Sequence, residues 1–130
     1  MSSPRALVAG HGDFASGMLS AVQLISGRDD VFVGMTNRNL GAQEVEAEMR
    51  DRVASGRIEV IFTDLPAGSC TMAARRIQRD QPYLTVVTGV NLVTLLDFVF
   101  QPDDHPEDAA RHAVEKGRSS LVVTGERRER

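Results

Sequence analysis

Two hydrophobic patterns follow one another along this chain, and their order constrains the fold more than any other feature. Short apolar runs with the length of a buried strand alternate with segments in which apolar residues recur every three or four positions. This alternation is typical of a parallel sheet whose crossover helices cover both faces. We expect strands at residues 6–9, 31–35, 59–64, 83–89 and 119–125, and helices at residues 16–26, 43–54, 69–78, 92–100 and 109–116.

Small residues mark the expected helix ends. Gly27 and Gly56 follow the first two helical segments and are expected to end them. Ser69 precedes the third segment and is expected to cap its N-terminus. The apolar faces of the second and third helices are predicted to carry Val45, Met49 and Val53, and Met72, Ala73, Ala74 and Ile77.

Composition narrows the class of protein. The chain has 130 residues, 42% of them hydrophobic, so we expect one domain with one core over residues 1–130. A net charge of −3 argues against a nucleic-acid binder. Cys70 is the only cysteine, which excludes an intrachain disulfide or a thiolate zinc cluster and favours a reduced, cytoplasmic setting. No signal peptide or membrane span is expected, because no apolar run approaches about 18 residues.

The predicted topology brings two ionisable residues together. A parallel sheet of this kind binds ligands at the carboxyl ends of its strands, where the strand order reverses. In the flavodoxin-like order 2-1-3-4, the first and third strands are neighbours beside that point. The residues that leave those strands are His11, between Gly10 and Gly12, and Asp64. The sequence therefore predicts an imidazole that faces a carboxylate.

Three stretches in these places carry a family resemblance. "LVAGHGDFASGMLSAVQLISG", "VIFTDLPAGSCTMAARRI" and "VVTGVNLVTLLDFV" together resemble the IIA domain of the mannose-type family of sugar phosphotransferase systems. The resemblance covers nearly the whole chain. It departs from the family where Ala67 and Cys70 replace the usual glycine and proline, and where Val93 replaces a proline.

The resemblance implies a function and an assembly. Members of the family are doubly wound α/β domains that form homodimers in which the last strand is exchanged, so the edge strand at residues 119–125 is expected to pair in this way. They accept a phosphoryl group from the phosphocarrier protein HPr on one histidine, here His11 with Asp64 as its partner. They pass it to a IIB domain, which phosphorylates sugar that enters through membrane IIC and IID subunits. The sugar itself stays open, because other subunits handle it.

The chemistry of the residues supports a phosphohistidine independently. A carboxylate on one imidazole N–H fixes the tautomer and leaves the other nitrogen nucleophilic. Phosphoryl oxygens need hydrogen-bond donors, and we expect Gly12, Gly68 and Ser69 to bind them, the last two at a helix N-terminus. Gly10 and Gly12 are expected to let such donors approach closely. No metal or other cofactor is required.

Other interpretations stay open at this point. The chain is also compatible with a regulatory IIA protein that is phosphorylated without a sugar permease, or with a phosphoryl donor to dihydroxyacetone kinase. A nucleotide-binding function is disfavoured, because no glycine-rich nucleotide motif is present. Cys70 is either a buried thiol or one activated by a helix N-terminus. The apolar helix at residues 92–100 fits a core or an oligomer surface, and His105 and His112 receive no function.

Overall fold

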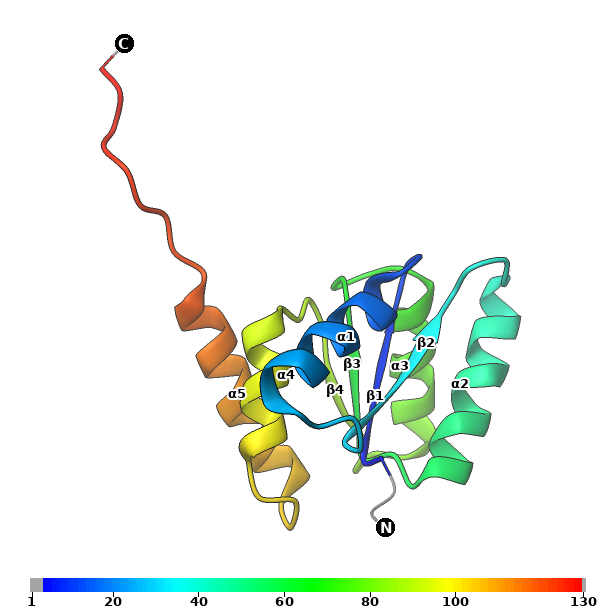
Figure 1. Ribbon diagram of the computed structural model, residues 1–130. Coiled ribbons are helices and arrows are strands. Elements are labelled where there is room, and N and C mark those ends of the chain that lie inside the picture. Colours follow the sequence, from blue (N-terminus) through cyan, green and yellow to red (C-terminus); the bar gives the residue numbers. More distant parts are fainter. Residues whose placement is uncertain (1–3, 130) are drawn as a thin grey trace.

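The computed structural model describes residues 4–129, which form a parallel sheet flanked by helices (Figure 1). The sheet has the strand order β2-β1-β3-β4, and every neighbouring pair is parallel. The predicted doubly wound α/β fold with its 2-1-3-4 order is therefore confirmed. The elements are β1 (Ala6–Gly10), α1 (Phe14–Ser26), β2 (Phe32–Thr36), α2 (Ala42–Gly56), β3 (Val60–Thr63), α3 (Ser69–Asp80), β4 (Thr85–Val87), α4 (Leu92–Phe100) and α5 (Pro106–Ser120).

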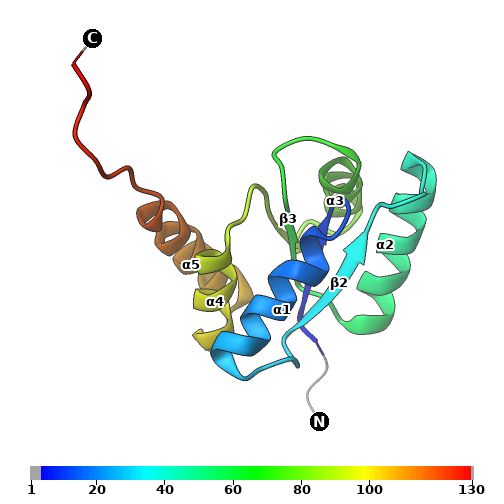
Figure 2. The ribbon, with the colours of Figure 1, turned by 45° about the horizontal axis from the view of Figure 1, so that its top comes forward.

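Two cores sandwich the sheet, because the side chains of a strand alternate between its faces. In β1, Ala6 and Val8 belong to the core under α1, α4 and α5, whereas Leu7 and Ala9 belong to the core under α2 and α3. Figure 2 shows these two helical layers on opposite sides of the strands. Burial on both faces makes the central strands a rigid mount for the residues that follow them.

The carboxyl ends of three strands meet at one edge of the sheet, at the top of Figure 1. The register pairs Ala9 of β1 with Thr63 of β3, so that His11 and Asp64 leave neighbouring strands. On the other side, Gly10 pairs with Thr36 at the end of β2. The segments that follow β1, β2 and β3 are thus neighbours in space.

Several details of the helices differ from the predictions. The second helix ends at Gly56 as predicted, but Gly56 is its last helical residue, and the left-handed cap with φ 56° is Arg57. Ser69 does not cap α3, because Gly68 is the N-cap residue and Ser69 is the first residue of the helix. Met72 was expected to face inward, but it is 43% exposed, since the buried side of α3 consists of Cys70, Thr71, Ala73, Ala74 and Ile77.

The predicted fifth strand at residues 119–125 does not form within a single copy of this chain. Helical hydrogen bonding continues through Ser120, and residues 121–129 form neither helix nor strand. They lead away from the sheet (Figure 1), so Leu121, Val122 and Val123 are exposed. A strand needs a neighbouring strand to satisfy its backbone groups, and this segment lies beside none among the described residues.

The very apolar helix α4 belongs to the core. Leu95, Phe98 and Val99 are buried, and the Phe98 ring packs edge-on against Phe62 with centroids 5.0 Å apart. Phe100 is the largest side chain of α4 that stays exposed. Neither α4 nor another helix within residues 4–129 is long and apolar enough to cross a membrane.

Candidate functional site

His11 and Asp64 are in contact where β1 and β3 end. The His11 Nδ1 atom lies 2.8 Å from Asp64 Oδ2, and the His11 main-chain N–H donates to the same oxygen over 2.9 Å. The Asp64 side chain is only 10% exposed, whereas that of His11 is 51% exposed. A carboxylate inside the protein thus fixes both the backbone and the ring of a residue at the surface.

This contact determines which ring nitrogen can react. A carboxylate accepts hydrogen bonds, so Nδ1 carries the proton and Nε2 keeps its lone pair. Nε2 has no hydrogen-bond partner among the described residues. A neutral imidazole oriented in this way is a nucleophile at Nε2.

Gly10 makes room for the carboxylate. A Cβ atom on Gly10 would lie 2.9 Å from Asp64 Cγ and Oδ2, and 2.8 Å from the Phe14 ring. No side chain fits at these distances. The sequence analysis interpreted Gly10 as clearance for phosphate donors, but in the structure its contacts are with Asp64 and Phe14.

Gly68 lies against the reactive edge of the histidine. A Cβ atom on Gly68 would be 3.2 Å from His11 Cε1 and 3.8 Å from Nε2, and the φ of +104° favours glycine. This is the position at which the chain retains the glycine of the family motif. The start of α3 therefore lies against the side of the His11 ring that carries Cε1 and Nε2.

The start of α3 is suited to bind an anion. The first hydrogen bond at this end of α3 runs from the Met72 N–H to the Gly68 carbonyl, so the N–H groups of Ser69, Cys70 and Thr71 lie outside the helical ladder. The first turn contains no acidic residue. Free N–H groups and the helix dipole together favour a negatively charged group here.

The loop after β2 adds a residue that the sequence analysis did not identify. The Asn37 Nδ2 group donates to Ser69 Oγ over 2.9 Å, and the Asn37 main-chain N–H donates to the Gly10 carbonyl over 3.2 Å. Asn37 thereby connects the end of β1 with the start of α3. The polar run "TNRN" directly after a strand was the signal that could have indicated it.

Arg38, in the same loop, places a positive charge beside Gly12. Its Nη2 atom donates to Asp13 Oδ1 over 2.9 Å and lies 3.5 Å from the position of a Cβ on Gly12. Gly12 has φ +53°, and its carbonyl accepts a hydrogen bond from Thr36 Oγ1 over 2.8 Å. Gly12 thus lies in the turn next to His11, as predicted, with a guanidinium near its main chain.

Cys70 is a buried thiol and not an activated one. Burial, and to a smaller extent the nearby Asp64 charge, raise its pKa from the ordinary 9.0 to about 11, although the Ser69 hydroxyl acts in the opposite direction. The side chain is 1% exposed. The alternative of a reactive thiol with a lowered pKa is therefore wrong.

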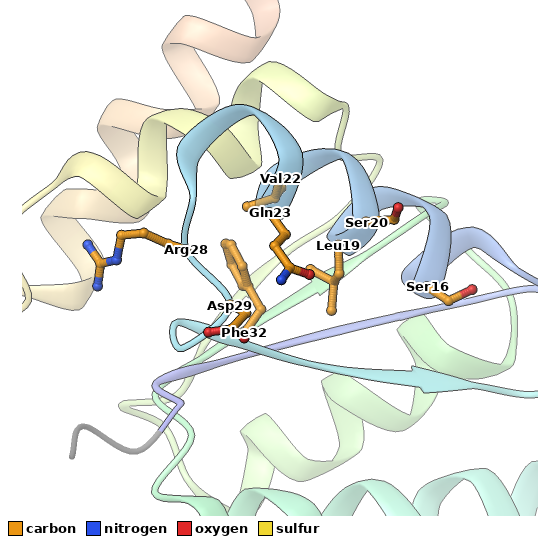
Figure 3. Close-up of a pocket in the computed structure, with 8 residues that line it drawn as sticks. All are labelled: Ser16, Leu19, Ser20, Val22, Gln23, Arg28, Asp29 and Phe32. Carbon is orange, nitrogen blue, oxygen red and sulfur yellow. The ribbon is translucent and has the colours of Figure 1, made fainter.

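Other polar groups lie apart from this edge of the sheet. A hollow of about 300 Å³ between α1 and the start of β2 is lined by residues that do not include His11 or Asp64 (Figure 3). His112 contacts Asp97 between α4 and α5, and His105 is exposed beside Asp104. Within residues 4–129, no three His, Cys, Asp or Glu side chains are grouped so that they could hold a metal ion.

Solved structures with the same fold include three phosphotransferase-system proteins. The mannose/sorbose-specific IIA subunit from Enterococcus faecalis is 23% identical, with a TM-score of 0.80 over 100% of both chains. An EIIA component from Streptococcus agalactiae is 20% identical, with a TM-score of 0.82 over 92% of this chain and 95% of that one. A IIA protein associated with the fucose utilization operon of Streptococcus pneumoniae is 23% identical, with a TM-score of 0.81 over 95% and 96%. A comparison with curated proteins gave no match.

The solved structures show only a shared fold, whereas a family profile shows the family of this chain. The profile of the mannose-type EIIA family, described as "PTS system fructose IIA component", matches residues 5–115. The match includes β1 with His11, β3 with Asp64 and the start of α3. The resemblance found in the sequence is thereby confirmed, and the chain belongs to the mannose-type family of phosphotransferase-system IIA components.

Proposed function

We propose that this chain is a cytoplasmic phosphoryl carrier that accepts a phosphoryl group from phospho-HPr on His11 and passes it to a IIB domain for coupled sugar uptake. One observation carries the proposal: Asp64 holds His11 Nδ1, while the free Nε2 faces Gly68 at the N-terminus of α3. Nucleophile, carboxylate and anion-binding backbone thus occupy one edge of the sheet.

The transfer exchanges one nitrogen–phosphorus bond for another. The His11 Nε2 lone pair attacks phosphorus, and the bond to the donor imidazole breaks with its electron pair kept by the donor. The proton on Nδ1 stays with the Asp64 contact, where the carboxylate stabilises the positive charge that develops on the His11 ring. Reversal of these steps onto the IIB domain regenerates the free imidazole, so the relay consumes no water and needs no cofactor.

Gly12, Gly68 and Ser69 are the proposed binding residues for the phosphoryl oxygens. Gly68 lies against the His11 ring at the start of α3, Ser69 follows Gly68 in the chain, and Gly12 follows His11. Their contribution is positioning and charge stabilisation, which account for most of the catalysis in phosphoryl transfer. The guanidinium of Arg38 near Gly12 supplies a further positive charge.

The test is phosphorylation of the purified chain by phosphoenolpyruvate, enzyme I and HPr. We expect one acid-labile phosphoryl group per chain, located on His11 by mass spectrometry, and its discharge when a mannose-type IIB domain is added. Label that remains on the chain with every IIB domain tried would favour the regulatory function. Discharge onto a dihydroxyacetone kinase instead would favour the donor function. Label on any residue other than His11 would contradict the site.

The proposal includes a homodimer in which the C-terminal segment pairs with a second copy. β4 pairs only with β3 among the described residues, so its outer edge is open. A groove of about 490 Å³ runs between this edge and α5. The exposed Leu121, Val122 and Val123 are apolar, and the two valines are β-branched, as is typical of a strand that lacks a partner.

Sedimentation of the full chain and of a chain that ends at Ser120 tests this assembly. We expect the full chain to sediment as a dimer and the shortened chain as a monomer. A full chain that is monomeric at high micromolar concentration, or a shortened chain that remains dimeric, would contradict the exchange.

A further inference from the structure

Asn37, in the loop after β2, donates a hydrogen bond to Ser69, the first residue of α3. Two main-chain hydrogen bonds hold Asn37 in place. Its main-chain N–H donates to Gly10 over 3.2 Å and its carbonyl accepts from the Leu40 N–H over 3.1 Å, so the loop after β2 is anchored to the end of β1. Its side chain then reaches Ser69 at the start of α3.

The direction of the Asn37–Ser69 hydrogen bond decides what the serine hydroxyl can do. An amide –NH₂ group only donates, so Ser69 Oγ is the acceptor in the 2.9 Å contact with Asn37 Nδ2. A hydroxyl has one proton and two lone pairs. With a lone pair occupied by Asn37, the proton of Ser69 is left for another acceptor.

A phosphoryl group on His11 would supply a strong acceptor at the start of α3. Ser69 follows Gly68, whose backbone faces His11 Cε1 and Nε2, and the Ser69 side chain does not cap the helix. In the unphosphorylated chain the Ser69 hydroxyl lowers the pKa of the neighbouring Cys70 thiol. Sulfur is a weak acceptor, whereas a phosphoryl oxygen carries negative charge and forms stronger bonds with hydroxyl donors.

We infer that Asn37 is a positioning residue that holds the Ser69 hydroxyl as a donor to the phosphoryl group on His11 Nε2. The inference rests on the proposed function, since it requires His11 to be phosphorylated. It assigns the loop after β2 to the site, together with the loops after β1 and β3. Ser69 is available as a donor because Asn37 donates to its hydroxyl oxygen, and a residue that accepted the hydroxyl proton at this position would remove that donor.

The direction can be tested by a nearly isosteric substitution. In Asn37→Asp the amide becomes a carboxylate, which accepts the Ser69 proton and withdraws it from the phosphoryl group. We expect Asn37→Ala to slow phosphorylation by phospho-HPr about tenfold, and Asn37→Asp to slow it more, because the acceptor and its charge both act against the phosphoryl group. Asn39→Gly is the matched control: Asn39 is exposed with φ 63°, and we expect it to retain the full rate.

A double-mutant cycle separates positioning from a structural role. If Asn37 acts through Ser69, Asn37→Ala has no further effect on the transfer rate in a Ser69→Ala background. The phosphorus NMR shift of the phosphohistidine is expected to move in the same direction in Ser69→Ala and Asn37→Asp, because both remove one hydrogen bond. Multiplicative rate losses in the double variant, or an Asn37→Asp rate equal to that of the unchanged chain, would overturn the inference.

Labelling of the unchanged chain by phospho-HPr distinguishes a failure of the proposed function from a failure of the Asn37 inference. If phospho-HPr does not label its His11, the proposed function fails, and the inference fails with it. If His11 is labelled and the Asn37 variants keep the full rate, only the inference fails. Thermal unfolding of each variant shows whether a rate loss follows from unfolding. If Asn37→Ala is unfolded, the transfer rate of Asn37→Asp, compared with that of Asn39→Gly, tests the inference.

Discussion

Two histidines of this chain hold an aspartate in nearly the same way, yet their surroundings differ. His11 Nδ1 lies 2.8 Å from Asp64 Oδ2, and His112 Nδ1 lies 2.7 Å from Asp97 Oδ2. Both histidine side chains are 51% exposed, and both aspartates are largely buried. By distance and exposure alone the two pairs cannot be distinguished.

The elements that carry the pairs set them apart. His11 and Asp64 follow two parallel strands, and the start of α3 lies against the His11 ring. His112 and Asp97 lie on the flanks of α5 and α4, two helices packed side by side, where Gln101 also donates to Asp97 over 3.4 Å. A helix flank has its N–H groups bonded within the helix, so it offers an anion no backbone donors.

The comparison teaches that a histidine–carboxylate pair does not by itself make a phosphorylation site. The carboxylate selects the tautomer in both places. Only at His11 does the N-terminus of a helix lie against the imidazole ring. We therefore interpret the pair of His112 and Asp97 as a contact that joins α4 to α5, and the following predictions test the distinction.

The largest difference is expected when each histidine is removed. His11→Ala should abolish labelling by phospho-HPr, because it removes the imidazole that lies against the start of α3. His112→Ala should retain full labelling. Acid-labile phosphate is measured on both variants under the same conditions. Label in His11→Ala, or its loss from a folded His112→Ala, would remove the distinction between the pairs.

Neutralising each carboxylate is expected to have the next largest effect. Asp64→Asn should slow transfer roughly 10²–10⁴-fold, because an amide neither fixes the tautomer nor stabilises the charged ring. Asp97→Asn should leave the rate unchanged and lower the free energy of unfolding by about 1 kcal/mol, because His112 is half exposed and solvent screens its contact with Asp97. Single-turnover kinetics and urea unfolding measure the two quantities. Equal rates for both variants would show that Asp64 is only structural.

A glycine near each pair gives a third contrast. In Gly68→Ala, a methyl group 3.2 Å from His11 Cε1 and a φ of +104° should slow transfer at least about tenfold. In Gly117→Ala, the methyl group would collide with the Thr94 side chain and lie 2.9 Å from Asn91 Oδ1. That overpacking should lower the free energy of unfolding by about 1–3 kcal/mol without a change in transfer rate. A rate loss shared by both variants would argue against a specific role for Gly68.

The smallest expected effect uses Cys70 as a reporter of the charge on Asp64. Burial and then Asp64 raise the Cys70 pKa to about 11, so the thiol stays protonated through pH 9 in the folded chain. Asp64→Asn should lower this pKa, whereas Asp97→Asn should not. The pH dependence of thiol alkylation measures the change. An unchanged profile in Asp64→Asn would contradict an effect of the Asp64 charge on the Cys70 pKa.

The same thiol makes stability depend on pH. The folded pKa is raised above the ordinary 9.0, so the folded state keeps its proton where the unfolded state loses it. The stability associated with the neutral thiol is therefore complete below about pH 9 and falls as the pH rises toward 11. Urea unfolding at pH 8 and pH 10 measures the decrease.

Hydrophobic periodicity predicted the helices and strands well wherever the spacing of apolar residues indicates the buried face of the element. Helix α4 lies at Leu92–Phe100 as expected, and α1 ends at Gly27, which adopts φ 74°. The misses lie at helix ends and at the C-terminus. Ser69 has the chemistry of a cap, but Gly68 takes that place because the chain must pass close to His11. The apolar residues 121–123 have strand propensity, but a strand also needs a partner.

By itself, the sequence determined that His11 and Asp64 would meet, because strand–helix alternation enforces a parallel sheet whose neighbouring strands end at the same edge. It also determined the family, through motifs that span most of the chain. Only the tertiary structure decided which groups surround the imidazole. The approach of Gly68 to Nε2 and the contact of Asn37 with Ser69 depend on the course of loops. No hydrophobic period encodes that course, because loop residues bury no regular face.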